Sequence, residues 1–251
     1  MTGAAHGMPC WYELSAASLE GAKAFYSKAL GWSVADSGTP GMQYWLATAG
    51  DDMVAGMMTA EAGQPLGWTP YFTVTSCDDS STLAASLGAT VIVPPADIPD
   101  TGRFSILIDP QGAGFGLLQP LPGGMGRAFD QQKPGHGNWH EVICADPLAA
   151  VAFYGKLFGW TMAQEMQMGP DMTYRILACN DVQVGGTFAP SPPAPAYWKV
   201  YFGVPSVKAA MQTVTAAGGR VLRGPDEVPG GAFTVQIEDA QGARLALVGG
   251  A

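Results

Sequence analysis

Two glutamates, Glu13 and Glu141, are the residues of this chain best placed to do chemistry. Each is the third residue of a W-x-E-[LV] motif, which begins at Trp11 and recurs at Trp139. Side chains alternate between the two faces of a strand, so the tryptophan and the glutamate of each motif share a face. A carboxylate beside a large aromatic group can act as a general base or hold a ligand hydroxyl or amine. A buried glutamate that only accepts hydrogen bonds within the sheet is the alternative.

More charged residues accompany the second motif than the first. Tyr197, Lys199 and Tyr201 share one face of a predicted strand, and Arg244 lies on the last predicted strand. We expect Lys199 and Arg244 to converge on Glu141 and to form a site for an anionic or carboxylate-bearing ligand. An internal ion pair between Lys199 and Glu141, without any ligand, is the alternative. The corresponding positions of the first half hold Thr69, Tyr71, Thr73 and Gly114.

The remaining candidate residues favour structural interpretations. His6 and His136 each stand in an H-G dipeptide before a predicted first strand, and we interpret both as solvated loop residues. His140 precedes a glutamate, but the metal-binding H-E-x-x-H pattern is missing. Strand alternation places it on the face opposite that glutamate. Trp32 and Trp160 each follow a predicted helix, and we expect both to pack that helix onto the sheet.

Composition excludes several classes of partner. The chain has 251 residues, a net charge of −9 and 13% charged residues, against a typical charged fraction of roughly 25%. Nucleic acids and anionic membranes require a basic surface, so neither is an expected partner. The low charge indicates a covered sheet surface or self-association, so we expect a monomer or a homodimer. Without a recognisable signal peptide or long apolar run, the chain is predicted to be cytoplasmic, with its four cysteines reduced and mostly buried.

An internal repeat organises the whole chain. The W-x-E-[LV] motif of the first half recurs in the second, and later pairs such as Tyr71-Phe72 and Tyr201-Phe202 follow in the same order and at nearly the same offset. A register held over this length indicates a duplication. We therefore predict one domain at 8–120, a Gly/Pro-rich linker at 121–137 and a second domain at 138–250.

The predicted elements repeat in the order βαβββ twice within each domain, which indicates an α+β fold. Apolar residues at helical spacing predict helices near 19–30, 79–87, 147–158 and 206–217. Strands are predicted in the first copy near 10–16, 43–49, 53–59, 71–76, 90–93, 103–108 and 114–119. Because three strands follow each helix, an alternating strand–helix α/β fold is not expected.

Two further motifs carry a resemblance to a known family. A-F-Y followed by G-W occurs at residues 24–32 and again at 152–160, and a D-P-Q-G turn at 109–112 is echoed at 239–242. With the βαβββ order, these motifs resemble the vicinal oxygen chelate superfamily of glyoxalases, bleomycin-resistance proteins and extradiol dioxygenases. The chain is similar to two-domain bacterial glyoxalase-like proteins. The resemblance implies that each domain consists of two βαβββ modules that form a curved-sheet cup, built within one copy or by exchange between copies.

The resemblance also implies where a divalent metal would bind. Enzymes of this superfamily use His, Gln or Glu from the first, fifth and last strands of a domain. In this chain the corresponding positions hold Trp11, Thr69 and Gly116 in the first copy and Trp139, Lys199 and Ala246 in the second. None of these residues is an ordinary metal ligand. We therefore predict no cofactor, and a divalent metal ion held by other residues is the alternative.

Three functions are consistent with this sequence. The first is a small-molecule binding protein for a metabolite, an aromatic compound or an antibiotic. The second is a glyoxalase- or dioxygenase-type enzyme (a lyase, isomerase or oxygenase), including a metal-independent one with Glu141 as catalytic base. The third is an interaction protein whose low charge reflects a partner surface. The predicted ligand-binding residues are Trp11, Glu13, Tyr71, Trp139, Glu141, Lys199, Tyr201 and Arg244.

Overall fold

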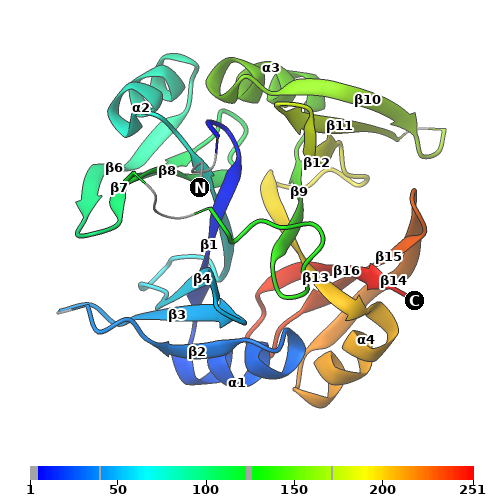
Figure 1. Cartoon of the computed structure of the whole chain (residues 1–251). Coiled ribbons are helices and arrows are strands. Elements are labelled where there is room, and N and C mark those ends of the chain that lie inside the picture. The colour runs from blue at the N-terminus through cyan, green and yellow to red at the C-terminus, as the bar shows by residue number, and fades with distance from the viewer. Residues whose placement is uncertain (1–4, 40, 123–125, 171) are drawn as a thin grey trace. The chain divides into compact units, whose positions relative to one another are not determined.

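The computed structural model describes residues 5–39, 41–122, 126–170 and 172–251, which form two eight-stranded mixed sheets and four helices (Figure 1). This confirms the α+β prediction. The elements of the first copy are β1 Pro9–Ala16, α1 Leu19–Ala29, β2 Ser33–Asp36, β3 Tyr44–Ala49, β4 Asp52–Thr59, β5 Gly67–Thr73, α2 Cys77–Ser86, β6 Thr90–Ile98, β7 Gly102–Ile108 and β8 Gly114–Pro120. The elements of the second copy are β9 Gly137–Ile143, α3 Pro147–Phe158, β10 Thr161–Gln167, β11 Thr173–Cys179, β12 Val182–Phe188, β13 Tyr197–Ser206, α4 Val207–Ala216, β14 Arg220–Val228, β15 Ala232–Glu238 and β16 Arg244–Gly250.

One predicted strand boundary and one missing strand differ from the structure for identifiable reasons. The strand predicted at 71–76 lies at Gly67–Thr73, because Ser76 is the N-cap of α2 and accepts a hydrogen bond from the backbone of Asp79. The strand β2 was not located at all. Only Val34 of its four residues is buried, so it has no alternating apolar pattern to detect.

Side-chain caps fix where the helices begin. Ser18 and Ser206 accept a backbone hydrogen bond from the residue three positions later, as Ser76 does, while Asp146 caps α3 ahead of Pro147. Gly159 ends α3 with a φ of 73°, a left-handed conformation that glycine adopts readily. Within the described part of the chain, no helix has the length and hydropathy needed to cross a membrane.

The strands with the W-x-E motifs occupy equivalent places in the two sheets. The strand orders are β2-β3-β4-β1-β5-β8-β7-β6 and β10-β11-β12-β9-β13-β16-β15-β14. β1 pairs with β4 in parallel, so that Glu13 stands opposite Gly56. β9 pairs with β12 in the same way, so that Glu141 stands opposite Gly186. Each motif glutamate therefore has a glycine beside it on the neighbouring strand.

Contacts divide the chain into two compact units, and each unit draws on both copies. Unit 1 consists of Met1–Cys10, Pro70–Gly126 and His140–Lys199, and unit 2 of Trp11–Thr69, Arg127–Trp139 and Val200–Ala251. Within unit 1, α2 packs against α3, and within unit 2, α1 packs against α4. The domain boundaries predicted above describe the sequence repeat, whereas these units describe the packing.

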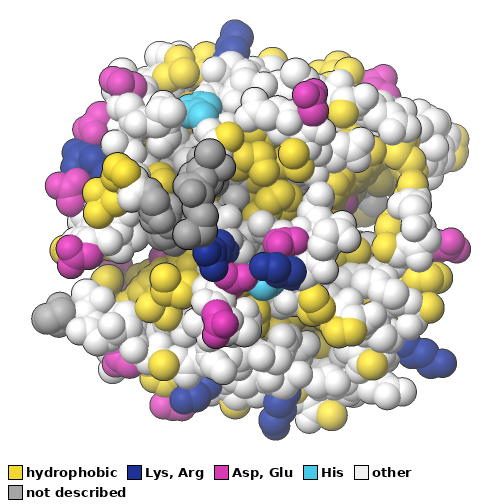
Figure 2. All heavy atoms as spheres, in the orientation of Figure 1, with side chains coloured by type: hydrophobic (Ala, Val, Ile, Leu, Met, Phe, Trp, Pro, Cys, Tyr) yellow, Lys and Arg dark blue, Asp and Glu magenta, His cyan; other side chains and the backbone are white. Residues whose placement is uncertain are grey.

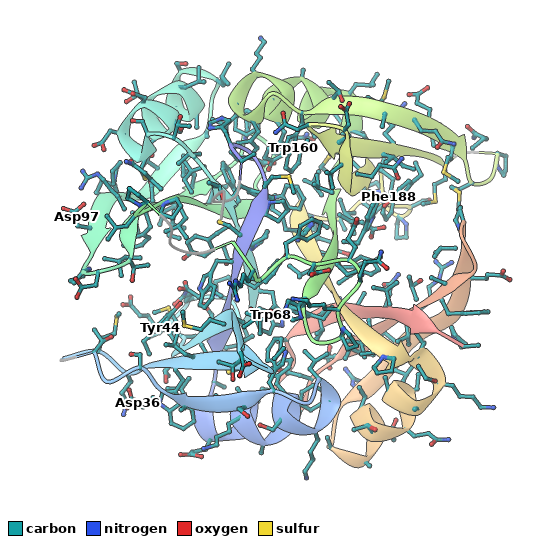
Figure 3. The ribbon with its side chains drawn as sticks, in the orientation of Figure 1. Asp36, Tyr44, Trp68, Asp97, Trp160 and Phe188 are labelled. Carbon is teal, nitrogen blue, oxygen red and sulfur yellow. The ribbon has the colours of Figure 1, made fainter. Side chains whose placement is uncertain are left out.

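The two units have equivalent aromatic cores. In unit 2 the rings of Tyr26, Trp32, Trp68 and Phe202 pack against one another, and in unit 1 those of Phe72, Tyr154, Trp160 and Trp198 do the same. Figure 3 labels Trp68 and Trp160, one from each core. The indole N–H groups of Trp32 and Trp160 donate to the backbone oxygens of Gly135 and Gly7, at 2.8 and 2.9 Å. Both tryptophans are buried, which confirms their predicted packing role. The four cysteines are also buried and free, as expected.

Each D-x-Q-G turn contacts the first helix of the other copy. The turn at 239–242 contacts α1 in unit 2, and the turn at 109–112 contacts α3 in unit 1. In unit 2, the Tyr26 hydroxyl donates to Asp239 at 2.9 Å, and the Gln241 side chain bonds the backbone of Ser18. In unit 1, Tyr154 donates to Asp109 at the same distance, and Gln111 bonds the backbone of Asp146. These turns are therefore structural joints between the copies.

Candidate functional site

The first candidate site lies in unit 2 and consists of Trp11, Glu13 and Tyr44, which we call the first carboxylate site. The indole N–H of Trp11 donates to the Tyr44 hydroxyl at 3.0 Å, and that hydroxyl donates to the Glu13 carboxylate at 3.1 Å. Burial, followed by the negative charge of Glu13, raises the pKa of Tyr44 well above its usual range. Tyr44 therefore keeps its proton and acts as a donor toward the carboxylate. Strand alternation had already placed Trp11 and Glu13 on one face.

Gly56 allows Tyr44 to reach Glu13 across the intervening strand. Tyr44 stands on β3 and Glu13 on β1, and β4 lies between these two strands. A Cβ atom at Gly56 would overlap the Tyr44 hydroxyl. The sequence-based site lacked Tyr44, although Tyr44 and Gly56 recur in the second copy as Tyr174 and Gly186, and this recurrence was the available signal.

The second carboxylate site lies in unit 1 and consists of Glu141, Tyr174 and Lys199. The Tyr174 hydroxyl donates to one oxygen of Glu141 at 3.0 Å, and the Lys199 ammonium lies 3.6 Å from the other. The Lys199 and Glu141 side chains keep only 8% and 10% of their surface exposed. The tyrosine ring lies against Gly186, where a Cβ atom would overlap it. The ion pair weighed as an alternative is therefore present, and the tyrosine arrangement repeats that of the first site.

The other predicted ligand-binding residues have separate surroundings. Tyr71, in unit 1, is buried and packs over Gly116, while in unit 2 Tyr201 is buried and pairs with Ala246. Trp139 is half-buried on β9. The Arg244 side chain is 72% exposed and lies 3.4 Å from Glu238. The contacts thus link Trp11 to Glu13 through Tyr44, and Glu141 to Lys199, while a ligand-binding role remains a prediction for all eight residues.

A separate charged cluster, the Asp52 cluster, involves a residue that the sequence did not single out. Asp52, at the start of β4, accepts from Arg127 at 3.1 Å and from Lys133 at 2.9 Å, and lies 3.3 Å from His136. Hydrogen bonds from Lys133 and then from Arg127 lower the pKa of Asp52 to about 2. His136 is only 2% exposed, so its interpretation as a solvated loop residue is wrong. Its ring also contacts the backbone oxygen of Pro134, and this contact fixes the loop.

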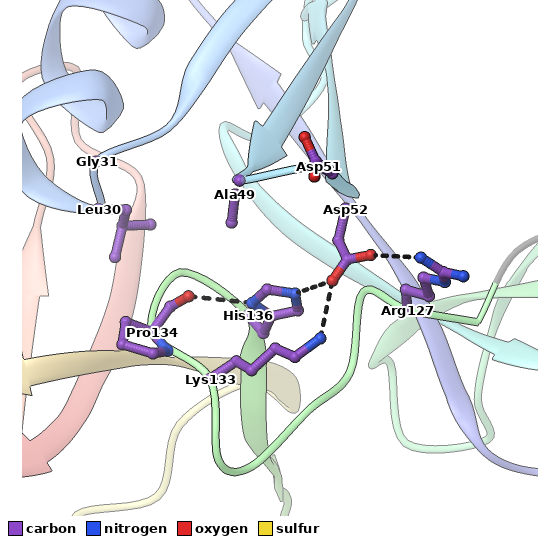
Figure 4. Close-up of a pocket in the computed structure, with 10 residues that line it drawn as sticks. Leu30, Gly31, Ala49, Asp51, Asp52, Arg127, Lys133, Pro134 and His136 are labelled. Carbon is purple, nitrogen blue, oxygen red and sulfur yellow. Dashed lines mark hydrogen bonds and ion pairs between the residues drawn. The ribbon is translucent and has the colours of Figure 1, made fainter.

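A cavity of about 470 Å³ opens beside the Asp52 cluster (Figure 4). Its lining residues are Leu30, Gly31, Ala49, Gly50, Asp51, Asp52, Arg127, Lys133, Pro134 and His136. Figure 2 shows basic, acidic and histidine side chains next to one another on the visible face of the molecule. In the close-up, Arg127, Lys133 and His136 all point toward Asp52, so opposite charges compensate one another within the cluster. This arrangement favours a structural role for the cluster.

Four of the six residues at the implied metal-ligand positions do not fit a divalent cation. At Trp11 the indole presents an N–H donor, and at Lys199 a cationic ammonium already faces Glu141. At Gly116 the ring of Tyr71 occupies the space of a side chain, and Ala246 is fully buried. Metal ions need lone-pair donors, which none of these groups supplies. Over the described residues, no group of three or more His, Cys, Asp or Glu side chains is placed to hold a metal.

Known proteins resemble this chain along most of its length. Residues 137–247 match the model of the Glyoxalase/Bleomycin resistance protein/Dioxygenase superfamily. "Putative glyoxylase CFP32" of Mycobacterium tuberculosis (strain CDC 1551 / Oshkosh) is 34% identical over 250 residues, which cover 96% of this chain and 94% of that protein. "Anthracycline biosynthesis protein DauV" of Streptomyces sp. (strain C5) is 25% identical over 266 residues, covering 99% and 95% of the two chains.

Solved structures share the fold at low sequence identity. The Mn(II)-bound glyoxalase from Novosphingobium aromaticivorans superimposes with a TM-score of 0.70 at 14% identity, covering 99% of this chain and 83% of that one. The 2,3-dioxygenase LapB from Pseudomonas sp. KL28 gives a TM-score of 0.69 at 16% identity, with 100% and 93% coverage. The mycobacterial relative is similar in sequence over nearly the whole chain, and the family model matches the second half. The chain therefore belongs to the glyoxalase/bleomycin resistance protein/dioxygenase superfamily.

Proposed function

We propose that this protein binds a small organic molecule at its carboxylate sites and that binding requires no metal ion. The observation that supports this most directly is the tyrosine–glutamate hydrogen bond present in both copies, at 3.1 and 3.0 Å. A carboxylate held in this way can accept a hydrogen bond from a ligand hydroxyl or ammonium group, and neighbouring aromatic rings supply an apolar wall. The Streptomyces relative is named for anthracycline biosynthesis, which is consistent with an aromatic ligand.

The proposed independence from metal follows from the chemistry of the residues present. Trp11 and Lys199 carry hydrogen-bond donors where this superfamily's enzymes carry metal ligands. A donor at these positions suits an electron-rich group of an organic ligand better than it suits a cation. The Mn(II)-bound glyoxalase therefore indicates the fold of this chain, and we propose that its metal ion is not required here.

The test is a thermal-shift and calorimetric screen of chelator-treated protein with catechol and benzylamine as probes. We expect at least one probe to raise the melting temperature and to bind saturably without added metal. Glu13→Gln and Glu141→Gln should each weaken binding at their own site, because an amide presents one acceptor oxygen and no negative charge. Stabilisation seen only after Ni, Zn, Mn or Fe is added would overturn the proposal.

An enzyme that uses Glu141 as a base is the second candidate. It is favoured by the placement of Glu141 between the Tyr174 hydroxyl and the Lys199 ammonium, two groups that can exchange protons with it. This candidate predicts that Glu141→Gln abolishes turnover while the protein stays folded. A stoichiometric divalent ion, found by elemental analysis of protein purified without chelating resin, would instead favour the metal-dependent chemistry of the superfamily.

A further inference from the structure

We propose that Lys199 forms a covalent imine with an aldehyde or ketone and that Glu141 transfers the protons this reaction needs. The inference rests on the proposed function, because it names the ligand class of the second carboxylate site. There an amine, a carboxylate and a phenol are connected by contacts of 3.6 and 3.0 Å around Glu141. Imine formation needs an amine nucleophile and a group that transfers protons, and both kinds of group are present at this site.

Lys199 differs from every other lysine of the chain. The chain has six lysines, and the other five, at positions 23, 28, 133, 156 and 208, are exposed. Lys199 alone is buried, with 7% of its surface accessible. Lysine is almost never fully buried unless it is paired, and lysines that form Schiff bases are typically buried. Burial therefore distinguishes Lys199 from the other five lysines.

Stability alone does not explain a lysine at this position. The first copy has Thr69 at the corresponding place, yet Tyr44 and Glu13 form the same hydrogen bond there. The tyrosine–glutamate pair is therefore compatible with an uncharged residue. Desolvation cancels most of the attraction in a buried ion pair, so such a pair contributes little net stability. The Lys199 ammonium lies 3.6 Å from Glu141, while Tyr174 makes the shorter contact to that carboxylate, at 3.0 Å.

The residues of this site account for every proton that the reaction moves. Glu141 first takes a proton from the Lys199 ammonium and leaves a neutral amine. The amine nitrogen then attacks the carbonyl carbon, a C–N bond forms, and after a proton moves from nitrogen to oxygen a carbinolamine results. The protonated Glu141 next gives its proton to the carbinolamine hydroxyl, water leaves, and the nitrogen lone pair completes the C=N bond. The net change converts an ammonium and a carbonyl into a protonated imine and water, with the imine cation facing the Glu141 carboxylate.

The surroundings favour an aromatic carbonyl compound. The ring of Tyr174 packs against that of Phe188 with 5.8 Å between the centroids, and Tyr197 stands two residues before Lys199 on β13. Aromatic rings prefer offset or edge contacts with other rings at such separations. Benzaldehyde is therefore a suitable probe, since it has one ring and one aldehyde.

The experiment treats the full chain with benzaldehyde and sodium cyanoborohydride, which reduces an imine to a stable secondary amine. Peptide mass spectrometry then compares labelling at Lys199 with labelling at the five exposed lysines. We expect labelling of Lys199 to be roughly a hundredfold faster, which is the low end of what a positioned proton-transfer group contributes. Equal or slower labelling of Lys199 would overturn the proposal, and the ion pair would then be structural only.

Variants separate the roles of the two residues. Glu141→Gln should reduce Lys199 labelling at neutral pH to the level of the exposed lysines and should change its pH profile, because the proton carrier is lost. An unchanged rate and profile in this variant would remove Glu141 from the proposal. Lys199→Arg should abolish the fast phase, whereas the matched control Lys208→Arg, on the exposed face of α4, should leave it intact.

Benzyl alcohol, which cannot form an imine, separates this inference from the proposed function. If it raises the melting temperature while benzaldehyde leaves no adduct on Lys199, the site binds aromatic molecules and the imine proposal alone is wrong. If neither compound interacts with the protein, both proposals are contradicted at this site. An adduct on Lys199 that benzyl alcohol slows by competition supports both.

Discussion

The hydroxyl of Tyr44 lies 3.1 Å from the carboxylate of Glu13, although the two residues stand on strands that are not neighbours. Gly56, on the strand between them, leaves the space that the tyrosine occupies. The second copy has the same relationship between Tyr174 and Glu141. The geometry of each carboxylate site therefore depends on a residue that has no side chain.

Replacing that glycine should disturb the first site directly. In Gly56→Ala, the new methyl group overlaps the Tyr44 hydroxyl, so the ring must move away from Glu13. We expect a loss of stability of about 1–3 kcal/mol, typical of overpacking, together with weaker binding of the probe at this site. Urea denaturation and calorimetry measure the two effects.

Gly114→Ala is the matched control for this variant. Gly114 also lies in a strand, and the nearest atom to an added Cβ there is 4.0 Å away. The control should retain both stability and binding. If Gly56→Ala behaves like Gly114→Ala, the tyrosine does not depend on the glycine and our description of the site is wrong.

The two buried tyrosines on the first helices should contribute similarly to stability. Tyr26 and Tyr154 donate to Asp239 and Asp109, and these carboxylates are only 3% and 4% exposed. Tyr26→Phe and Tyr154→Phe each remove a donor from a buried carboxylate, so we expect each to cost about 1–3 kcal/mol of unfolding free energy. Chemical denaturation checks this, and a loss in one variant without a loss in the other would contradict the equivalence of the two joints.

His140 should make the protein less stable in mild acid. It is fully buried, and burial lowers its pKa to about 4 from an ordinary 6.5. The unfolded chain therefore binds a proton more readily than the folded one between these two values, so stability is complete above pH 6.5 and falls as the pH drops toward 4. The loss can reach about 3 kcal/mol.

Denaturation curves measured from pH 7 to pH 4 check the effect of His140. In His140→Gln the difference in stability between these pH values should be smaller by about that amount, since glutamine does not titrate. The ring contact between His140 and the Val184 backbone oxygen, at 2.7 Å, is the interaction that glutamine can partly replace. An identical pH dependence in both proteins would show that His140 does not become charged in this range.

The buried residues of the Asp52 cluster should contribute more to the unfolding free energy than its exposed residues. Asp52→Ala leaves the buried ring of His136 without its carboxylate partner, and we expect a loss of about 1–3 kcal/mol. Arg127→Ala removes a side chain that is 64% exposed, and solvent screens such a pair, so it should change the unfolding free energy much less. Equal losses in the two variants would contradict this ranking.

The fold was largely predictable because the sequence repeats its own pattern. Helix α3 was predicted at 147–158 and lies at Pro147–Phe158, where a capping aspartate and a terminal glycine mark both ends. The α+β class followed from three strands after each helix. Strand β2 could not be predicted, since a short strand with a single buried residue carries no periodic signal.

The candidate sites were only partly predictable. Alternation correctly placed Trp11 with Glu13, because both stand on one strand, and the possible Lys199–Glu141 pair was recognised from residue types. Tyr44 and Tyr174 were missed because they approach from non-adjacent strands, a relationship that local periodicity does not encode. His136 was misinterpreted because its partner Asp52 is distant from it in the sequence.

Calorimetric titration of chelator-treated protein with catechol is the most direct test of metal-independent binding. We expect saturable binding to the native chain and its loss in the Glu13→Gln/Glu141→Gln double variant, with the far-ultraviolet circular dichroism unchanged. Binding that appears only after Mn²⁺ or Fe²⁺ is added, or that is equally strong in the double variant, would contradict a metal-independent site built on these two carboxylates.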